Sequence, residues 1–382
     1  MRKIIKYIDK PLLITTIVFF IFGLVMIFSA SNVIAYMAHE VSASYYFIRQ
    51  AIFLIMGLVL SLIMIRVPTK TYGILSWFLL IAFSISLVVL LIFIAPKNEA
   101  RSWFKIGPIS IQPSEFIKII TIVWLSYYYE IKQKHLNTYT TSLAPIFVCA
   151  FIALLIFLQP DLGTTILYCF IVATIFFAVP IDKEIKKKTV YLAIGLVVFA
   201  GVVFISTGTK LLQQRQLERF DIFRPCDKLL TTGNQVCNSY IAINNGGLTG
   251  TGLGNSTQKY LYLPEPYTDF IFAVIVEELG LVTGIIIILL YLFIIYRILW
   301  IGRASPTNRG ATMCYGIAVY IFLHVAINLM GMFGLMPLTG VPLPFLSYGG
   351  SFTICLIAAL TIVQRVSVEN GLNREKEKKE FI

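Results

Sequence analysis

The chain has 382 residues, of which 58% are hydrophobic and only 13% are charged, and its mean hydropathy is +0.84. Soluble domains do not carry so much apolar sequence, and several runs approach the roughly 20 apolar residues that a transmembrane helix needs. A net charge of +12 could suit a nucleic-acid-binding protein, but no exposed basic domain separates the apolar runs. We therefore expect an all-α integral membrane protein without a nucleic-acid partner.

The apolar runs predict a bundle of about ten transmembrane helices in a single domain that covers residues 1–382. In chain order they occupy residues 11–30, 47–65, 72–95, 114–130, 142–158, 163–180, 189–207, 270–296, 311–336 and 352–368. The first run lacks a small-residue cleavage site, so we interpret it as a retained helix and not as a signal peptide.

Basic residues indicate the orientation of these helices. Most of them flank one set of helix ends: Arg2, Lys3, Lys6, Lys10, Arg66, Lys70, Lys132, Lys134, Lys183, Lys186, Lys187, Lys188, Arg297, Arg303, Arg309, Arg365, Arg374, Lys376, Lys378 and Lys379. Cytoplasmic loops are enriched in Lys and Arg, so this side is expected to be cytoplasmic. Both termini then lie inside the cell, and residues 369–382 form a basic cytoplasmic tail.

Three outer segments differ from simple connections. Residues 96–113 join the third and fourth spans, and residues 208–269 form a large extracellular loop between the seventh and eighth; loops of that length usually have a function. Within it, "SYIAI" (239–243) fits a short amphipathic helix. Residues 336–351 are rich in Pro and Gly, and irregular backbone at membrane depth needs polar partners, so this segment is expected to line a cavity.

The large loop contains a candidate disulfide. Cys226 and Cys237 are eleven positions apart on the expected outer side, where oxidation can occur; two free thiols are the alternative. The three histidines of the chain fall at three different membrane levels, so they cannot join these cysteines at a metal ion, and no protein metal site is expected.

The fourth span begins with charged residues in "ARSWFKIGPISIQPSEFIKII" (100–120). Ser114 is expected to cap the helix, with Glu115 in the first turn, where the helix dipole favours an anion. Lys118 follows on the same side of the helix, and a charge at the bilayer centre costs about 2.5–3.5 kcal/mol on insertion scales. Either a Glu115–Lys118 pair reaches the membrane surface, or Lys118 contacts an anionic ligand.

"LQPDLGTT" (158–165) interrupts a hydrophobic run and places Asp161 at its tip. Two interpretations are open. Asp161 caps the sixth span at a tight outer turn, or it orients a neighbouring cation.

Carboxylates also surround the start of the eighth span in "LPEPYTDFIFAVIVEELG" (263–280). Asp269 lies at the outer boundary of the membrane. Partial desolvation there raises the proton affinity of a carboxylate, which suits a general base near neutral pH. The structural alternative is that Thr268 or Asp269 caps the span. Glu277 and Glu278 lie about two turns deeper and are expected to be structural, paired with buried donors or cations.

Together these features predict an outer-facing, water-filled pocket. Cations from two loops and a carboxylate at the rim would suit an anionic amphiphile such as a lipid-linked diphosphate.

Four ordered motifs carry a resemblance to a known family: "RSWFKIGPISIQPSEFIK", "QPDLGTT", "GLTGTGLGNSTQKYLYLPEPYTDFIFAVIVEELG" and "LTGVPLPFLSYGGS". The chain resembles the SEDS family (shape, elongation, division and sporulation), which includes FtsW, RodA and SpoVE. The likeness spans essentially the whole chain. The start of the chain and "KYLYLPEPYTDFIF" are most similar to the division-type FtsW.

The resemblance implies a peptidoglycan glycosyltransferase that polymerises lipid II at the outer face of the bacterial plasma membrane, at the division septum. It also implies a class B penicillin-binding protein as transpeptidase partner, together with divisome proteins. The essential aspartate of the family corresponds to Asp269, and its functionally important Arg, Trp and Lys correspond to Arg101, Trp103 and Lys118. Tyr267 departs from the pattern, because many relatives have His there.

The resulting hypothesis is that Asp269 deprotonates the attacking sugar hydroxyl, with inversion at the donor. The substrate-binding candidates are Arg101, Trp103, Lys105, Lys118, Arg215, Arg219 and Glu265. The supporting candidates are Glu115, Asp161, Glu277, Glu278, Ser347 and Gly349. No cofactor is certain, although a divalent Mg or Mn ion could accompany the diphosphate. A lipid II flippase, an elongation-type (RodA-like) polymerase and a non-enzymatic scaffold are the alternatives.

Overall fold

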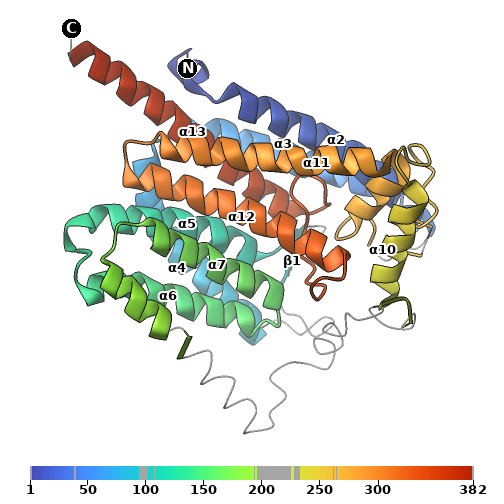
Figure 1. Cartoon of the computed structure of the whole chain (residues 1–382), viewed down its shortest axis with the longest axis horizontal. Coiled ribbons are helices and arrows are strands. Elements are labelled where there is room, and N and C mark those ends of the chain that lie inside the picture. The colour runs from blue at the N-terminus through green and yellow to red at the C-terminus, as the bar shows by residue number, and fades with distance from the viewer. Residues whose placement is uncertain are drawn as a thin grey trace.

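The computed structural model shows an almost entirely helical bundle. It describes residues 2–37, 40–93, 102–106, 109–192, 194–195, 225–227, 233–260, 262–263 and 265–380. In Figure 1 the long helices run side by side, and both chain termini lie at one end of the bundle. Helix α10 (Gly233–Gly246) lies across the other end.

Every expected span except the seventh has a long helix. In chain order these are α2 (Lys10–Met37), α3 (Tyr45–Met64), α4 (Thr69–Phe93), α5 (Pro113–Ile131), α6 (Tyr139–Phe157), α7 (Leu162–Ala178), α11 (Ile271–Arg303), α12 (Asn308–Met332) and α13 (Gly350–Glu380). The shorter elements are α1 (Arg2–Tyr7) and the 3₁₀ turns η1 (Gln133–His135) and η2 (Pro225–Asp227). The seventh expected span lies mostly outside the described residues, although residues 183–192 are helical.

Within the described residues, seven helices are long and apolar enough to cross a membrane: α2, α3, α4, α6, α11, α12 and α13. Helix α7 is apolar but has 17 residues. Helix α5 is more polar, and nearly all of its side chains are buried between α4, α7, α12 and α13. Because protein and not lipid surrounds α5, it can carry charges inside a multi-pass membrane protein.

Small residues allow these helices to pack closely. A Cβ added to Gly316 on α12 would lie 2.8 Å from Ile122 of α5, and one added to Gly73 on α4 would overlap the Tyr127 ring. Membrane helix interfaces depend on such close contacts, because lipid removes the hydrophobic drive for association.

Helix α11 is broken at Gly280, which has φ +85° and ψ 165°. Before the break, residues 271–278 are buried without exception; after it, Val282 (52% exposed) and Leu289 (58% exposed) face outward. The expected span 270–296 is therefore wrong in its bounds. A short enclosed helix precedes the membrane-facing helix, which continues to Arg303.

The prediction of an all-helical protein missed a β-hairpin, which lies between α4 and α5. Strands β1 (Phe104–Ile106) and β2 (Ile109–Ile111) pair antiparallel, with Lys105 opposite Ser110. The strand residues are mostly aromatic or β-branched, which favours extended structure.

Ion pairs connect the helices at the end that contains both termini. Arg297 of α11 pairs with Asp9, and Arg309 of α12 pairs with Glu130 of α5. Within α13, Arg365 pairs with Glu369 at 3.1 Å, and Glu369 accepts from the Thr69 hydroxyl of α4. These contacts place the expected cytoplasmic helix ends at one level.

Candidate functional site

The four sequence motifs converge on the α12–α13 loop (residues 333–349). The Ser347 hydroxyl donates to the Thr268 carbonyl at 2.6 Å, just before α11. At the start of α7, a Cβ added to Gly163 would lie 2.6 Å from Thr339 Cβ. Beyond the loop, Ser351 donates to the carbonyl of Ser110 in the hairpin at 3.2 Å. Segments separated by up to about 240 positions thus meet at the end of the bundle opposite the termini.

Asp269 lies at this convergence and is half-buried. Helix α11 begins at Ile271, and its N-cap is Phe270, which makes no side-chain capping bond. The Thr268 hydroxyl donates instead to the Glu265 carbonyl at 3.0 Å. The N-cap position is therefore Phe270, and the alternative that places it at Thr268 or Asp269 is wrong.

Asn328 of α12 fixes the backbone beside Asp269. Its side-chain amide donates to the Asp269 carbonyl at 3.0 Å and to the Val341 carbonyl at 2.9 Å. The carboxylate packs over Gly340, where an added Cβ would lie 3.7 Å from Oδ2. Gly340 has φ +71°, a backbone conformation that residues other than glycine rarely adopt.

Ser347 and Gly349, both supporting candidates, hold the α12–α13 loop in place. Ser347 Oγ accepts from the backbone N–H of Leu343 at 2.8 Å, in addition to its bond to Thr268. The Gly349 N–H donates to Gln50 Oε1 of α3 at 3.2 Å. The loop backbone is irregular, and protein groups satisfy these polar atoms.

Three tyrosines form a cluster beside Asp269. The Tyr267 ring centroid lies 4.3 Å from that of Tyr46 and 5.8 Å from that of Tyr348. Burial raises the pKa of the Tyr267 phenol, followed in size by its hydrogen bond with Tyr46, and burial raises the pKa of Tyr348 to about 12. These phenols stay neutral near pH 7. Tyr267 therefore cannot serve as the base in place of a carboxylate.

Lys118 and Glu115 form an ion pair inside the protein. Lys118 Nζ lies 2.7 Å from Glu115 Oε1, and both side chains are at most 4% exposed. The ammonium group also lies 3.2 Å from His324 Nε2 of α12, while His324 Nδ1 lies 3.2 Å from the Pro342 carbonyl. A pair that reaches the membrane surface is therefore wrong, because neighbouring helices cover it. Through His324, this pair is connected to the α12–α13 loop at Pro342.

The start of α5 also differs from the expectation. Its N-cap is Gln112, with Pro113 in the first turn, and Ser114 Oγ has no hydrogen-bond partner. Ser114 is thus not the cap. The Gln112 amide donates to Asp161 Oδ2 at 3.1 Å, and Asp161 Oδ1 accepts from the Thr164 N–H at the start of α7.

Glu277 and Glu278, for which the sequence predicts a structural role, are fully buried at the break in α11. Glu277 accepts hydrogen bonds from the hydroxyls of Ser256 and Thr257 and from the Asn245 amide. Glu278 pairs with Lys259 at 2.9 Å and accepts from the hydroxyl of Ser29 on α2. These bonds tie the Gly-rich segment to α11.

Other substrate-binding candidates lie in the outer segments. Trp103 is 44% exposed, and Lys105 is exposed on strand β1. Glu265 is exposed in a left-handed conformation with φ +53°. Arg101, Arg215 and Arg219 lie outside the described residues.

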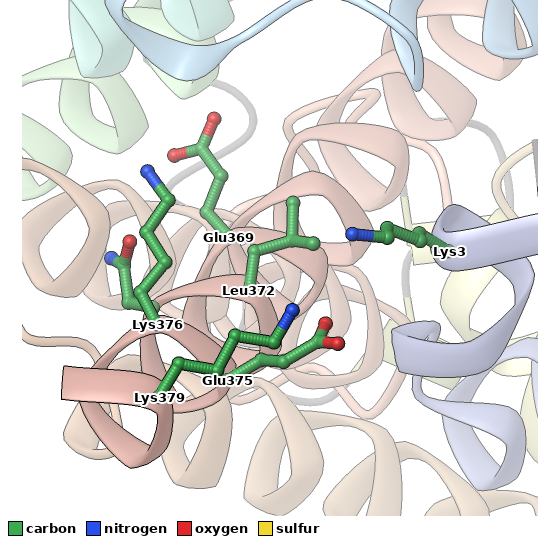
Figure 2. Close-up of a pocket in the computed structure, with 7 residues that line it drawn as sticks. Lys3, Glu369, Leu372, Glu375, Lys376 and Lys379 are labelled. Carbon is green, nitrogen blue, oxygen red and sulfur yellow. The ribbon is translucent and has the colours of Figure 1, made fainter. Parts of the chain in front are cut away.

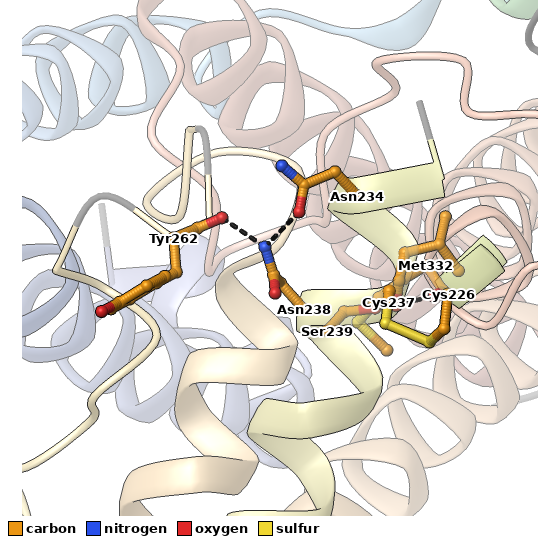
Figure 3. Close-up of a disulfide and its surroundings, with 8 residues drawn as sticks. Cys226, Asn234, Cys237, Asn238, Ser239, Tyr262 and Met332 are labelled. Atoms are coloured by element: carbon orange, nitrogen blue, oxygen red, sulfur yellow. Dashed lines mark hydrogen bonds between the residues drawn. A yellow bond between two sulfur atoms is a disulfide. The ribbon is translucent and has the colours of Figure 1, made fainter. Parts of the chain in front are cut away.

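A disulfide joins Cys226 of η2 to Cys237 of α10 (Figure 3). On the same helix, the Asn238 amide donates to the Tyr262 carbonyl at 2.6 Å. The Ser239 hydroxyl donates to the Met332 carbonyl, at the end of α12, at 3.1 Å. The described part of the large loop is therefore docked on the bundle and leads directly into the Asp269 segment.

Sequence reasoning missed several of these residues. Asn328 and His324 both lie in the apolar stretch "IFLHVAINLMGM", and polar residues within such a run are a signal for an intramembrane site. Gln112 gave no comparable signal, because its partner Asp161 is 49 positions away.

The described residues contain no cluster of three or more His, Cys, Asp or Glu side chains that could bind a metal. Mg²⁺ usually takes one or two carboxylates together with substrate phosphates. A divalent ion at this part of the protein would therefore depend on the diphosphate for ligands.

A family model described as "Cell cycle protein", covering FtsW, RodA and SpoVE, matches residues 10–372. The probable peptidoglycan glycosyltransferase FtsW of Bacillus subtilis is 36% identical over 100% of this chain and 95% of its own length. Stage V sporulation protein E of the same organism is 35% identical over 94% of this chain and 96% of its own length.

Two solved structures have the same fold. One is a chain of a peptidoglycan synthase complex, with a TM-score of 0.74, 23% identity, and coverage of 95% of this chain and 98% of that one. The other is the rod shape determining protein RodA of Thermus thermophilus, with a TM-score of 0.65, 23% identity, and coverage of 94% and 96%.

Proposed function

The chain belongs to the FtsW/RodA/SpoVE family of cell cycle proteins, and on this premise we propose that it is a peptidoglycan glycosyltransferase. It polymerises lipid II into glycan strands at the outer face of the plasma membrane, for septal wall synthesis. The FtsW relatives, which are named as probable peptidoglycan glycosyltransferases, support this function. The observation that carries it is Asp269, a half-buried carboxylate just before the start of α11, at the point where four motifs meet.

The reaction transfers one glycan to another. The 4-hydroxyl of the acceptor sugar attacks the anomeric carbon of the donor, and Asp269 takes the hydroxyl proton. The new glycosidic C–O bond forms as the bond to undecaprenyl diphosphate breaks, with inversion at that carbon. Asn328 and Gly340 fix the position of the base, because one bonds its backbone and the other leaves space for its carboxylate.

Charge on the leaving diphosphate needs nearby cations. We assign this role to Arg101, Lys105, Arg215 and Arg219 of the outer segments. Lys118, a further candidate, is enclosed in the ion pair with Glu115, so it acts on the site through the α12–α13 loop. Trp103 and Glu265 are exposed and are assigned to contacts with the sugars.

The position of the site explains why the catalyst is a membrane protein. The lipid tails of both substrates stay in the bilayer while their sugar–diphosphate groups reach the outer end of the bundle. A class B penicillin-binding protein would then cross-link the product, in the way that the related complex coordinates polymerization and crosslinking. Adding EDTA to the polymerisation reaction tests whether a divalent ion accompanies the diphosphate.

The test of this function uses the purified full-length protein with its transpeptidase partner and lipid II. Glycan polymer should form, and its length is read on a gel. A flippase would instead move lipid II across vesicles without making polymer, and a scaffold would do neither. Either of these results overturns the proposed activity.

A further inference from the structure

A cavity of about 280 Å³ lies at the end of the bundle that contains both termini, away from Asp269. Its lining comes from α1 and from the last turns of α13: Lys3, Glu369, Leu372, Asn373, Glu375, Lys376 and Lys379. Figure 2 shows the Lys3 side chain reaching across from α1 toward Leu372, with Lys376 and Lys379 extending from α13. The reaction proposed above uses none of these residues.

The walls of this cavity are fixed by contacts between its two helices. The Tyr7 hydroxyl of α1 donates to Glu375 Oε2 at 3.1 Å, and the Ser367 hydroxyl donates to the Tyr7 carbonyl at 3.0 Å. Tyr7 packs so closely on Gly371 that an added Cβ would overlap its ring. Helices α1 and α13 are therefore held at a set separation.

The charges of the cavity are unbalanced. Both oxygens of Glu369 accept bonds from Thr69, and Arg365 donates to one of them at 3.1 Å. Glu375 accepts from Tyr7, so both carboxylates are already engaged. The ammonium groups of Lys3, Lys376 and Lys379 form no ion pair with any described residue. Three lysines thus share one small space with two carboxylates, which leaves one positive charge in excess among the lining residues.

The cavity also lies at the end of the bundle whose basic residues predict the cytoplasmic side of the membrane. Ion pairs of Arg297 with Asp9 and of Arg365 with Glu369 mark the helix ends beside it. On α1, Ile5 is 61% exposed next to exposed lysines, a pattern typical of a helix at a membrane interface. Basic residues beside membrane helices attract anionic lipids, at about 1 kcal/mol for each Lys or Arg.

We propose that this cavity binds the phosphate of an anionic phospholipid headgroup from the adjacent leaflet, through Lys3, Lys376 and Lys379. Its volume lies just below the roughly 300–1,000 Å³ of pockets for whole small molecules, which suits a headgroup whose acyl chains remain in the bilayer. The bound lipid bridges α1 and α13, the first and last helices of the structure.

Native mass spectrometry of the full-length protein in detergent tests this site. Dioctanoyl phosphatidylglycerol is titrated against dioctanoyl phosphatidylcholine, and binding should favour the anionic lipid. A contribution of about 1 kcal/mol corresponds to about fivefold in affinity for each lysine removed. The triple variant Lys3→Gln, Lys376→Gln, Lys379→Gln should therefore bind phosphatidylglycerol at least tenfold more weakly, with an unchanged melting temperature.

The matched control removes three exposed lysines outside the cavity: Lys132→Gln, Lys183→Gln and Lys187→Gln. It should bind phosphatidylglycerol like the parent protein. Asn373→Asp, which adds a negative charge to the cavity and removes no lysine, should weaken binding as well. Equal loss in both triple variants would overturn the site. Displacement of the lipid by an equal concentration of inorganic phosphate would overturn its assignment to a lipid.

Discussion

Charged side chains of this bundle fall into two groups by exposure. Lys118, Glu277 and Glu278 are fully buried and hydrogen-bonded within the protein, whereas Asp269 is half-buried and Glu265 exposed. A charge removed from water needs close partners. The enclosed residues therefore stabilise the bundle, and the partly exposed carboxylate is the one that can meet a substrate.

The buried ion pair gives the first prediction. Lys118→Met leaves Glu115 buried without its cation, which should cost about 3–5 kcal/mol of stability. The melting temperature of the purified protein in detergent should fall clearly. The double variant Glu115→Gln, Lys118→Met removes both charges and should recover most of the loss. A double variant as unstable as Lys118→Met would contradict this account of the pair.

Asn328 gives the second prediction. Asn328→Ala removes the bonds to the carbonyls of Asp269 and Val341, and each buried acceptor left unsatisfied costs about 1–3 kcal/mol. Polymerisation should slow more than lipid II binding weakens, because the base moves while the substrate contacts stay. Asn370→Ala, which also removes a buried amide bond but at the other end of the bundle, is the control. Equal effects of the two variants on turnover would count against a positioning role.

For individual side chains, the sequence identified candidate functional residues but not the residues that they contact. Asp269 and Glu115 are conspicuous as carboxylates in apolar surroundings. The contact between Lys118 and His324 joins positions 206 apart, and no local pattern predicts such a pairing. The expectation that Asp161 caps the sixth span is confirmed. Those for Ser114 and Thr268 failed, because both have the right residue type for a cap but different neighbours.

Helix α11 shows how an element can differ from its hydropathy. Residues 271–276 are apolar because protein encloses them, and the residues after Gly280 are apolar because lipid contacts one face. A hydropathy pattern is the same in both cases, so the sequence predicts one continuous span. The Thr251 and Gly252 N–H groups donate to the carbonyls of Glu277 and Glu278 at 2.9 Å each, which satisfies the backbone at the break.

Gly280 gives the third prediction. Gly280→Ala places a side chain at φ +85°, where it would also overlap the Leu248 carbonyl. Strain of this kind costs about 1–3 kcal/mol before the overlap is counted, so the melting temperature should drop. Gly195→Ala, where an added Cβ meets nothing within 4 Å, should leave it unchanged. A stable Gly280→Ala protein would show that the break is not required.

The overall arrangement of the helices was the most predictable feature of the molecule. Apolar runs located the nine long helices of the described residues, and both termini lie at one end of the bundle (Figure 1). The docking of the large loop was not predictable, because it depends on contacts between distant segments, such as the one from Ser239 to Met332. The hairpin is a local pairing of six strand residues, too short to show a clear alternation in the sequence. The assignment of that end to the cytoplasm still rests on its basic residues.

Membrane orientation gives the fourth prediction. A cysteine introduced at exposed Tyr262 should react with a membrane-impermeant maleimide in intact spheroplasts. A cysteine at exposed Lys378 should react only after permeabilisation. The parent protein, with its own cysteines, sets the background. Labelling of the Lys378→Cys protein in intact spheroplasts would reverse the orientation and move Asp269 to the inner face.

The most direct measurement is glycan synthesis from lipid II by the Asp269→Asn protein with its transpeptidase partner. General-base catalysis contributes about 10²–10⁴-fold, so polymer formation should fall by at least about 100-fold while the melting temperature holds. Glu265→Ala, at an exposed carboxylate nearby, should have a milder effect. Normal polymerisation by well-folded Asp269→Asn protein would contradict the proposal that this carboxylate takes the proton.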